Sequence, residues 1–183
     1  VMLGAMAAPM LALAACGSDP TPTPQAEEPP IVMQAGEWEL TRKTTGYNTP
    51  TVTPAQYQEA LKQIGEEKLC IAFDADNAPD ADALAGPEGQ DCVYKDKLVR
   101  KGRLIATLSC KAGAGVSELV VEGNYTNDSM TLGTTMTKTE GGKPVLRTTH
   151  DLTARRVGDC PKAGWPGTRH RLRQVHGFAL GFR

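Results

Sequence analysis

The sequence predicts a mainly β protein of the α+β class, in which a curved antiparallel meander packs on one short N-terminal helix and carries two disulfides. Apolar and polar residues alternate with a period of two in several runs between residues 92 and 154. Short turn sequences separate these runs, and four cysteines remain once Cys16 is set apart. The chain has 183 residues, which suits one domain with tails. We expect the sheet to wrap around the helix or to close toward a barrel.

The first fifteen residues predict export and lipid attachment. They form an apolar run without charge, about as long as the core of a signal peptide and too short to span a bilayer. The run ends in Leu13-Ala14-Ala15-Cys16, which resembles the bacterial lipobox. By this resemblance, residues 1–15 are a lipoprotein signal peptide and Cys16 is acylated after cleavage. No Lys or Arg precedes the run, so an ordinary signal peptide with a chance cysteine is the alternative.

Residues 16–32 predict a tether that joins the lipid anchor to the folded domain. Five prolines lie between Ser18 and Pro30, and this stretch has no apolar residue larger than alanine. Gly17, rather than an aspartate, follows Cys16. By resemblance to enterobacterial sorting rules, this favours the periplasmic face of the outer membrane. A single domain is then expected over residues 33–160.

The domain is expected to begin with a strand and a helix. Residues 36–41 alternate, which places Trp38 and Leu40 on one face of a strand. Thr53 as N-cap, a following proline and Gln56 three residues on predict a helix start with a capping box. The apolar residues of this helix recur at helical spacing and are expected to pack into the core: Tyr57, Leu61 and Ile64. Residues 69–73 predict a short buried strand.

Residues 74–91 are rich in Asp, Ala, Pro and Gly and predict a loop. Its acids suggest a calcium site: Asp74, Asp76, Asp80 and Asp82. The EF-hand spacing fails, because Pro79 stands where glycine is needed and Ala85 replaces the last glutamate. We therefore expect a solvated acidic loop and no metal.

The remainder of the domain is expected to form consecutive hairpins. The predicted strands are residues 92–99, 103–110, 119–125, 130–136 and 146–154. Residues 100–102 are expected to form a three-residue turn with glycine at the left-handed position. β-Branched residues dominate the outward face, as they do on an exposed sheet: Thr131, Thr135, Thr137, Thr149 and Thr153.

Four cysteines in an exported domain predict two disulfides, with three possible connectivities. If residues 100–102 form the turn, residues whose numbers sum to 202 face each other, so Cys92 faces Cys110. The last strand then ends at the opposite sheet edge, where Cys160 reaches Cys70. This order favours Cys92–Cys110 with Cys70–Cys160. A different strand order would favour Cys70–Cys92 with Cys110–Cys160.

Several of these features together resemble the bacterial family called domain of unknown function 3617. They are Gly36-Glu37-Trp38-Glu39, the order of the four cysteines, the hairpin from Tyr125 to Leu132 and the closing Arg155-Arg156-Val157-Gly158-Asp159-Cys160. The resemblance covers about residues 34–160. Family members often show Pro-Gly-Leu-Trp-Glu at the first strand, where this chain has Ala35 and Glu37. The resemblance implies an exported protein, often a lipoprotein, without an assigned activity.

We do not expect an enzyme. The domain has one histidine, His150, and alternation sends it and Asp151 to opposite faces of a strand, so they cannot form an acid–base pair. Neither a nucleophile elbow nor a Gly-rich phosphate loop is present in the sequence. No cofactor is expected. The formal net charge of −1 gives no reason to expect a nucleic-acid partner.

The sequence therefore predicts a binding module for a small hydrophobic ligand, held to the membrane by its lipid anchor. The inward residues that suit an apolar pocket, or equally a filled core, are Trp38, Tyr125, Met130 and Met136. The alternative is a structural role, in which the threonine-rich face contacts another envelope protein. Residues 161–183 carry five bases and no acid, and we expect a disordered extension there.

Overall fold

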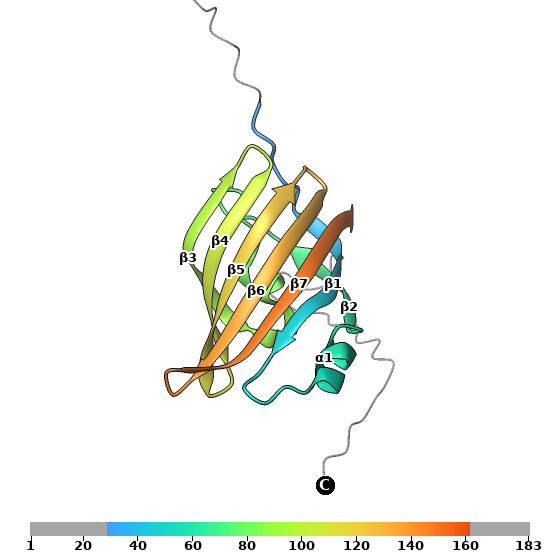
Figure 1. Cartoon of the computed structure of the whole chain (residues 1–183). Coiled ribbons are helices and arrows are strands. Elements are labelled where there is room, and N and C mark those ends of the chain that lie inside the picture. The colour runs from blue at the N-terminus through green and yellow to red at the C-terminus, as the bar shows by residue number, and fades with distance from the viewer. Residues whose placement is uncertain (1–28, 162–183) are drawn as a thin grey trace, which may run out of the picture.

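A single curved antiparallel sheet forms the body of the protein, in a computed structural model that describes residues 29–161 (Figure 1). Its strands are β1 (Gly36–Asn48), β2 (Ile64–Ile71), β3 (Gln90–Arg100), β4 (Arg103–Ala112), β5 (Gly115–Tyr125), β6 (Ser129–Glu140) and β7 (Lys143–Gly158). They lie in the order β2-β1-β7-β6-β5-β4-β3. The meander is therefore confirmed from β3 to β7. Closure into a barrel is wrong, because β2 and β3 are the two free edges of the sheet.

The β3–β4 hairpin differs from its predicted register near the turn. Arg100 faces Arg103, so the turn has two residues, Lys101 and Gly102, and both have positive φ. A two-residue turn with positive φ at both positions has a backbone twist that matches the right-handed twist of the flanking strands. A register shift between Tyr94 and Asp96 then moves the pairing by one residue. Just beyond this bulge, facing residues have numbers that sum to 202 as predicted, for example Tyr94 and Leu108. Beside the turn, the numbers of facing residues sum to 203 instead, as for Arg100 and Arg103.

The two disulfides join Cys92 to Cys110 and Cys70 to Cys160, which is the favoured pairing. Cys92–Cys110 links the edge strand β3 to β4, and Cys110 is buried. Cys70–Cys160 straddles β1, because Glu37 of that strand faces both Cys70 and Gly158. The edge strand β3 is thus tied covalently to its neighbour β4, and the edge strand β2 to Cys160, which follows β7, across β1.

The predicted helix forms, but it does not enter the core. Helix α1 (Pro54–Ala60) has the capping box: the Thr53 N–H donates to Gln56 Oε1 at 2.9 Å, and the Gln56 N–H donates to Thr53 Oγ1 at 3.3 Å. None of its residues is buried. The core role expected for its apolar stripe is wrong, because the helix ends before the stripe is complete. Ile64 instead begins β2 and is 60 % exposed. Packing of the sheet on this helix is accordingly not confirmed.

The chain returns over the concave face of the sheet by another segment. Residues 72–89, which we call the strap, join β2 to β3, that is, one free edge to the other. The strap contains α2 (Ala81–Ala85) and the 3-10 helix η1 (Gly86–Glu88). Asp80 caps α2, since its Oδ1 accepts the Asp82 N–H at 2.9 Å. The prediction of a solvated loop is wrong: Ala83, Leu84 and Ala85 are buried in the core.

The core lies between the strap and the inner face of the sheet. Alternation puts one set of side chains from each strand on this face: Trp38 and Leu40, Leu104 and Leu108, Leu119 and Val121, Met130 and Leu132, and Leu152 and Ala154. Leu84 of the strap, which is 1 % exposed, belongs to the same cluster. Burial of this apolar surface is the main term that stabilises the fold.

Two glycines at neighbouring strands give a matched test of this packing. Gly123 of β5 faces Leu132 of β6, and a Cβ there would clash with the Thr131 carbonyl oxygen and lie 2.8 Å from Leu132 Cα. Both obstacles are backbone, so Gly123→Ala is expected to lower the free energy of unfolding by about 1–3 kcal/mol in urea titrations. At Gly133 the nearest atom to a Cβ, the Glu122 carbonyl oxygen, is 3.7 Å away. Gly133→Ala should therefore leave stability unchanged or raise it slightly, and equal losses at both positions would contradict this packing.

Candidate functional site

The concave face of the sheet and the strap over it form the candidate site. The structure brings the four predicted ligand-lining residues into one buried cluster: Trp38, Tyr125, Met130 and Met136. Ala83, Leu84 and Ala85 of the strap belong to the same cluster. The predicted apolar surface therefore exists, and the chain's own strap covers it.

The N-terminal end of the strap packs on Trp38. The Phe73 ring meets the indole edge to face, with the ring centroids 5.8 Å apart. Trp38 Nε1 donates to the Gln34 carbonyl oxygen at 3.1 Å. Asn77 at the following turn accepts the Met33 N–H at 2.9 Å and donates to the Ile31 carbonyl oxygen at 3.3 Å. The strap is thus bonded to Ile31 and Met33, where the predicted tether meets the domain.

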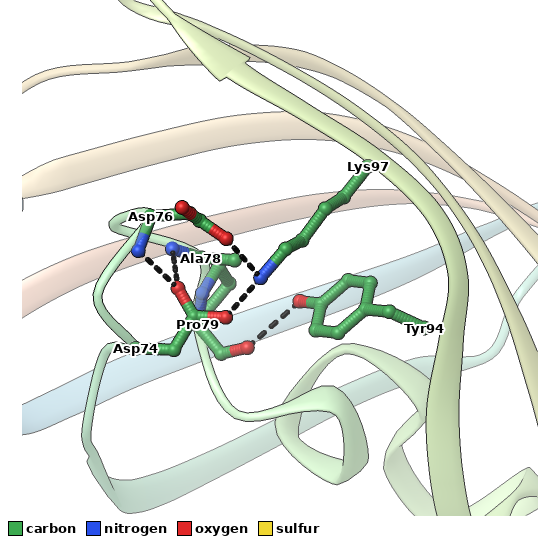
Figure 2. Close-up of polar contacts among 6 residues, drawn as sticks. All are labelled: Asp74, Asp76, Ala78, Pro79, Tyr94 and Lys97. Carbon is green, nitrogen blue, oxygen red and sulfur yellow. Dashed lines mark hydrogen bonds and ion pairs between the residues drawn. The ribbon is translucent and has the colours of Figure 1, made fainter.

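Lys97 of β3 fastens the strap at its acidic turn (Figure 2). Its Nζ forms ion pairs with Asp74 and with Asp76, the latter at 2.9 Å. Asp74 Oδ1 also accepts the N–H groups of Asp76 and Ala78, both at 2.9 Å. Beside them, the Tyr94 hydroxyl donates to the Pro79 carbonyl oxygen at 2.7 Å. Two side chains of the edge strand β3 therefore hold the turn in place.

The protonation states at this turn favour the closed strap at neutral pH. Burial raises the pKa of Asp74, but the hydrogen bond from Lys97 and the backbone N–H groups of Ala78 and Asp76 outweigh it, so the pKa lies below its ordinary value. Burial raises the pKa of the Tyr94 phenol, and the charges of Asp74 and Asp80 add to this rise. Asp74 is therefore ionised and Tyr94 keeps its proton, as both contacts require.

This arrangement predicts a change in titration when Lys97 is replaced. In Lys97→Met, the pKa of Asp74 followed by NMR should rise, because its cation is lost while its burial remains. The lowered pKa stabilises the fold above the unfolded value near 3.8, and this stabilisation is lost as the pH falls through the folded pKa. The variant should therefore lose less stability than the wild type as the pH is lowered below about 4.

Lys95→Met is the matched control, because Lys95 lies on the outer face of β3, away from the strap. Its Nζ lies 2.9 Å from Glu118 Oε2 of β5. It should leave the pKa of Asp74 unchanged. An unchanged Asp74 pKa in Lys97→Met would show that Lys97 does not hold the strap.

Arg42 holds the other end of the strap. Its side chain is buried on the inner face of β1 and donates to the Leu84 carbonyl oxygen at 3.0 Å and to that of Ala83 at 3.3 Å. Its Nη2 also lies 3.5 Å from Glu67 Oε1 of β2. A Cβ at Gly86, where φ is +64°, would lie 2.8 Å from Arg42 Nη2, so the chain needs glycine there. The guanidinium thus caps the C-terminal end of α2.

Sequence reasoning missed Arg42, although a signal was present. Arg42 continues the even-numbered series of Trp38 and Leu40, which predicts an inward side chain. A charged residue at an inward position indicates either a functional group or a structural ion pair. Because arginine is mostly exposed in proteins, alternation by itself does not single out Arg42 as buried.

Further buried polar side chains lie among the apolar ones on the inner face: Thr44, Thr148, His150, Thr134 and Ser117. Thr44 faces His150, which in turn faces Thr134. Within residues 29–161, the hydroxyls of Ser117 and Thr134 are buried without a hydrogen-bond partner. Since buried polar groups are normally paired, these two hydroxyls mark unused binding capacity on this face.

His150 and Asp151 lie as alternation predicts. His150 is buried on the inner face, whereas Asp151 is exposed on the outer face. They cannot exchange a proton directly with one another.

The acids that suggested calcium serve the strap instead. Asp74 and Asp76 pair with Lys97, Asp80 caps α2, and Asp82 Oδ1 accepts the Cys92 N–H at 2.8 Å. In the part of the chain that the structure describes, no three residues among His, Cys, Asp and Glu are grouped to hold a metal ion. Nor does any helix there have the length and apolar character needed to cross a bilayer. Cys16 and the basic residues from 162 onward lie outside the described residues.

The comparison with protein families decides the membership of this chain. A family model described as protein of unknown function (DUF3617) matches residues 33–160. The chain belongs to this family. The DUF3617 match spans all seven strands, the strap and both disulfides, and it confirms the resemblance inferred from the sequence. No curated protein and no solved structure matches the chain.

Proposed function

We propose that this DUF3617 protein is a lipoprotein of the bacterial cell envelope, anchored through Cys16 at the periplasmic face of the outer membrane. The sequence around Cys16 and the proline-rich tether support this location. Two disulfides also suit an oxidising compartment.

Labelling of bacterial cells with a palmitate analogue tests the anchor. The wild type should incorporate the label and fractionate with outer membranes, whereas Cys16→Ala should do neither. Label in both proteins, or in neither, would overturn the proposed anchor.

We further propose that the protein is a non-enzymatic binding module whose concave face takes up a small hydrophobic ligand. The observation that carries this proposal is the strap. A broad apolar face is covered by one chain segment rather than by a second layer of helices or strands. Lys97, Tyr94 and Arg42 hold that segment at its ends by polar contacts. Local opening of such a segment costs less than global unfolding and would expose the apolar face.

A neutral fluorescent probe such as N-phenyl-1-naphthylamine tests the strap as a cover. If binding requires opening, a weakened strap raises the open fraction and tightens the apparent affinity in proportion. Lys97→Met should therefore bind the probe several-fold more tightly than the wild type, while Lys95→Met should match the wild type. Circular dichroism would verify that all three proteins are folded. Equal binding by the three, or none, would overturn the ligand proposal.

A second candidate function, contact with another envelope protein, is supported by the convex face. Thr41 faces Thr153, which faces Thr131, so three strands contribute one row of threonines. Thr45 and Thr149 begin a second row, with a hydrogen bond of 3.2 Å between their hydroxyls. A photo-crosslinker at Thr153 should then trap one defined partner in cells, and a crosslinker at the exposed Leu98 of β3 is the control. The same products from both positions would overturn this candidate.

A further inference from the structure

We propose that the ligand of the concave face is a single-chain amphiphile with a carboxylate head, which Arg42 binds while the apolar residues bind the chain. This inference rests on the ligand-binding function proposed above. It follows from what the strap itself places against the sheet.

Helix α2 occupies the inner face as an internal substitute for such a ligand. Its apolar side chains, of which Leu84 is the largest, fill the apolar cluster. Its last carbonyl oxygens, on Ala83 and Leu84, accept two hydrogen bonds from the Arg42 guanidinium. The C-terminal end of a helix carries partial negative charge. An apolar body that ends in two partly negative oxygens has the chemistry of a fatty acid.

Opening of the strap would leave the Arg42 guanidinium without two of its acceptors. The side chain is only 9 % exposed, and a buried charge that loses hydrogen-bond acceptors is destabilised. A carboxylate offers two oxygens in the geometry that the guanidinium fork binds best. A ligand with this head would therefore restore both hydrogen bonds, whereas a purely apolar ligand would not.

The residues opposite one another across the sheet supply the rest of the site. From Arg42 on β1, the facing residues across the next four strands are Leu152, Leu132, Gly123 and Leu104. This row begins with a charge and continues over about 19 Å, at the usual spacing between strands, with three buried leucines and the half-buried Gly123. In the adjacent row, the unpartnered Thr134 hydroxyl offers a further hydrogen bond. This row of the inner face is thus charged at one end and apolar along the rest of its length.

Glu67 provides a test at a residue outside the apolar cluster. Its carboxylate lies near Arg42 Nη2 and would repel a bound carboxylate head. Glu67→Gln should therefore tighten the binding of dodecanoate several-fold and leave the binding of dodecanol unchanged. Arg42→Lys keeps the charge but loses the fork, and it also loosens the hold on the strap. It should therefore lower the ratio of dodecanoate affinity to dodecanol affinity, which does not depend on how often the strap opens.

The measurement is displacement of N-phenyl-1-naphthylamine from the full chain, with its disulfides intact, by dodecanoate, dodecanol or dodecyltrimethylammonium below their micelle-forming concentrations. Dodecanoate should bind at least tenfold more tightly than the other two. Equal affinities for dodecanoate and dodecanol, or no response to Glu67→Gln, would overturn the assignment of the head group while the hydrophobic site stands. If neither the probe nor any amphiphile binds, both the head-group assignment and the proposed ligand-binding function are wrong.

Discussion

Replacement of both Cys70 and Cys160 by alanine is expected to lower the free energy of unfolding by about 4–5 kcal/mol. The bond closes a loop with a sequence separation of 90, so its loss frees the unfolded chain from a long-range constraint. The bond lies on the exposed side of β1, and Cys70 itself is exposed, so little core packing is lost. Unfolding in guanidinium chloride measures the change.

The slope of the unfolding free energy with denaturant separates this effect from a loss of packing. The unfolded variant should be more expanded and expose more surface, so the slope should increase. A loss below about 1 kcal/mol with an unchanged slope would contradict the role given to this disulfide.

Trp38→Ala is expected to lower the free energy of unfolding by about 3–5 kcal/mol. The indole is 0 % exposed, contacts the Phe73 ring, and donates to the Gln34 carbonyl oxygen. The substitution therefore leaves a cavity at the centre of the core and detaches the strap at its first aromatic contact. Urea titration followed by far-ultraviolet circular dichroism measures the loss without the tryptophan signal.

Two further variants identify the origin of that loss. Trp38→Phe keeps an aromatic ring but removes the indole N–H, and should cost about 1–2 kcal/mol less than Trp38→Ala. Val120→Ala, at a side chain on the convex face that is 43 % exposed, should change stability by less than about 0.5 kcal/mol. A comparable loss at Val120 would show that the convex face is covered as well.

Features that depend on neighbouring residues were predictable. The inward positions of Leu119, Val121 and Leu132 follow from alternation, since successive side chains of a strand point to opposite faces. The capping box at Thr53 and Gln56 also forms as expected, because both of its hydrogen bonds close within four residues. Alternation along the strands also predicted the inward positions of the candidate lining residues, Trp38, Tyr125, Met130 and Met136.

Features that depend on distant partners were not predictable. Helix α2 has five residues and is too short to be stable alone, so the sequence around Leu84 reads as a loop. Its stability comes from burial against the sheet and from Arg42, which lies 42 residues earlier. Ile64 fits a helical stripe, yet it pairs with Lys43 in the β1–β2 ladder. The bulge beside Lys95 likewise shifts the register without a local signal.

The sequence by itself determined β1 and the strands of the meander, β3 to β7, with their inward and outward faces, and the start of α1. A period of two and a helix cap are local properties of the chain. Only the tertiary structure decided that β1 lies beside β7, that the sheet stays open and that the strap fills its concave face. These outcomes depend on which apolar surfaces and polar groups find partners far away in sequence. The ligand proposal and the assignment of Arg42 both depend on this second kind of information.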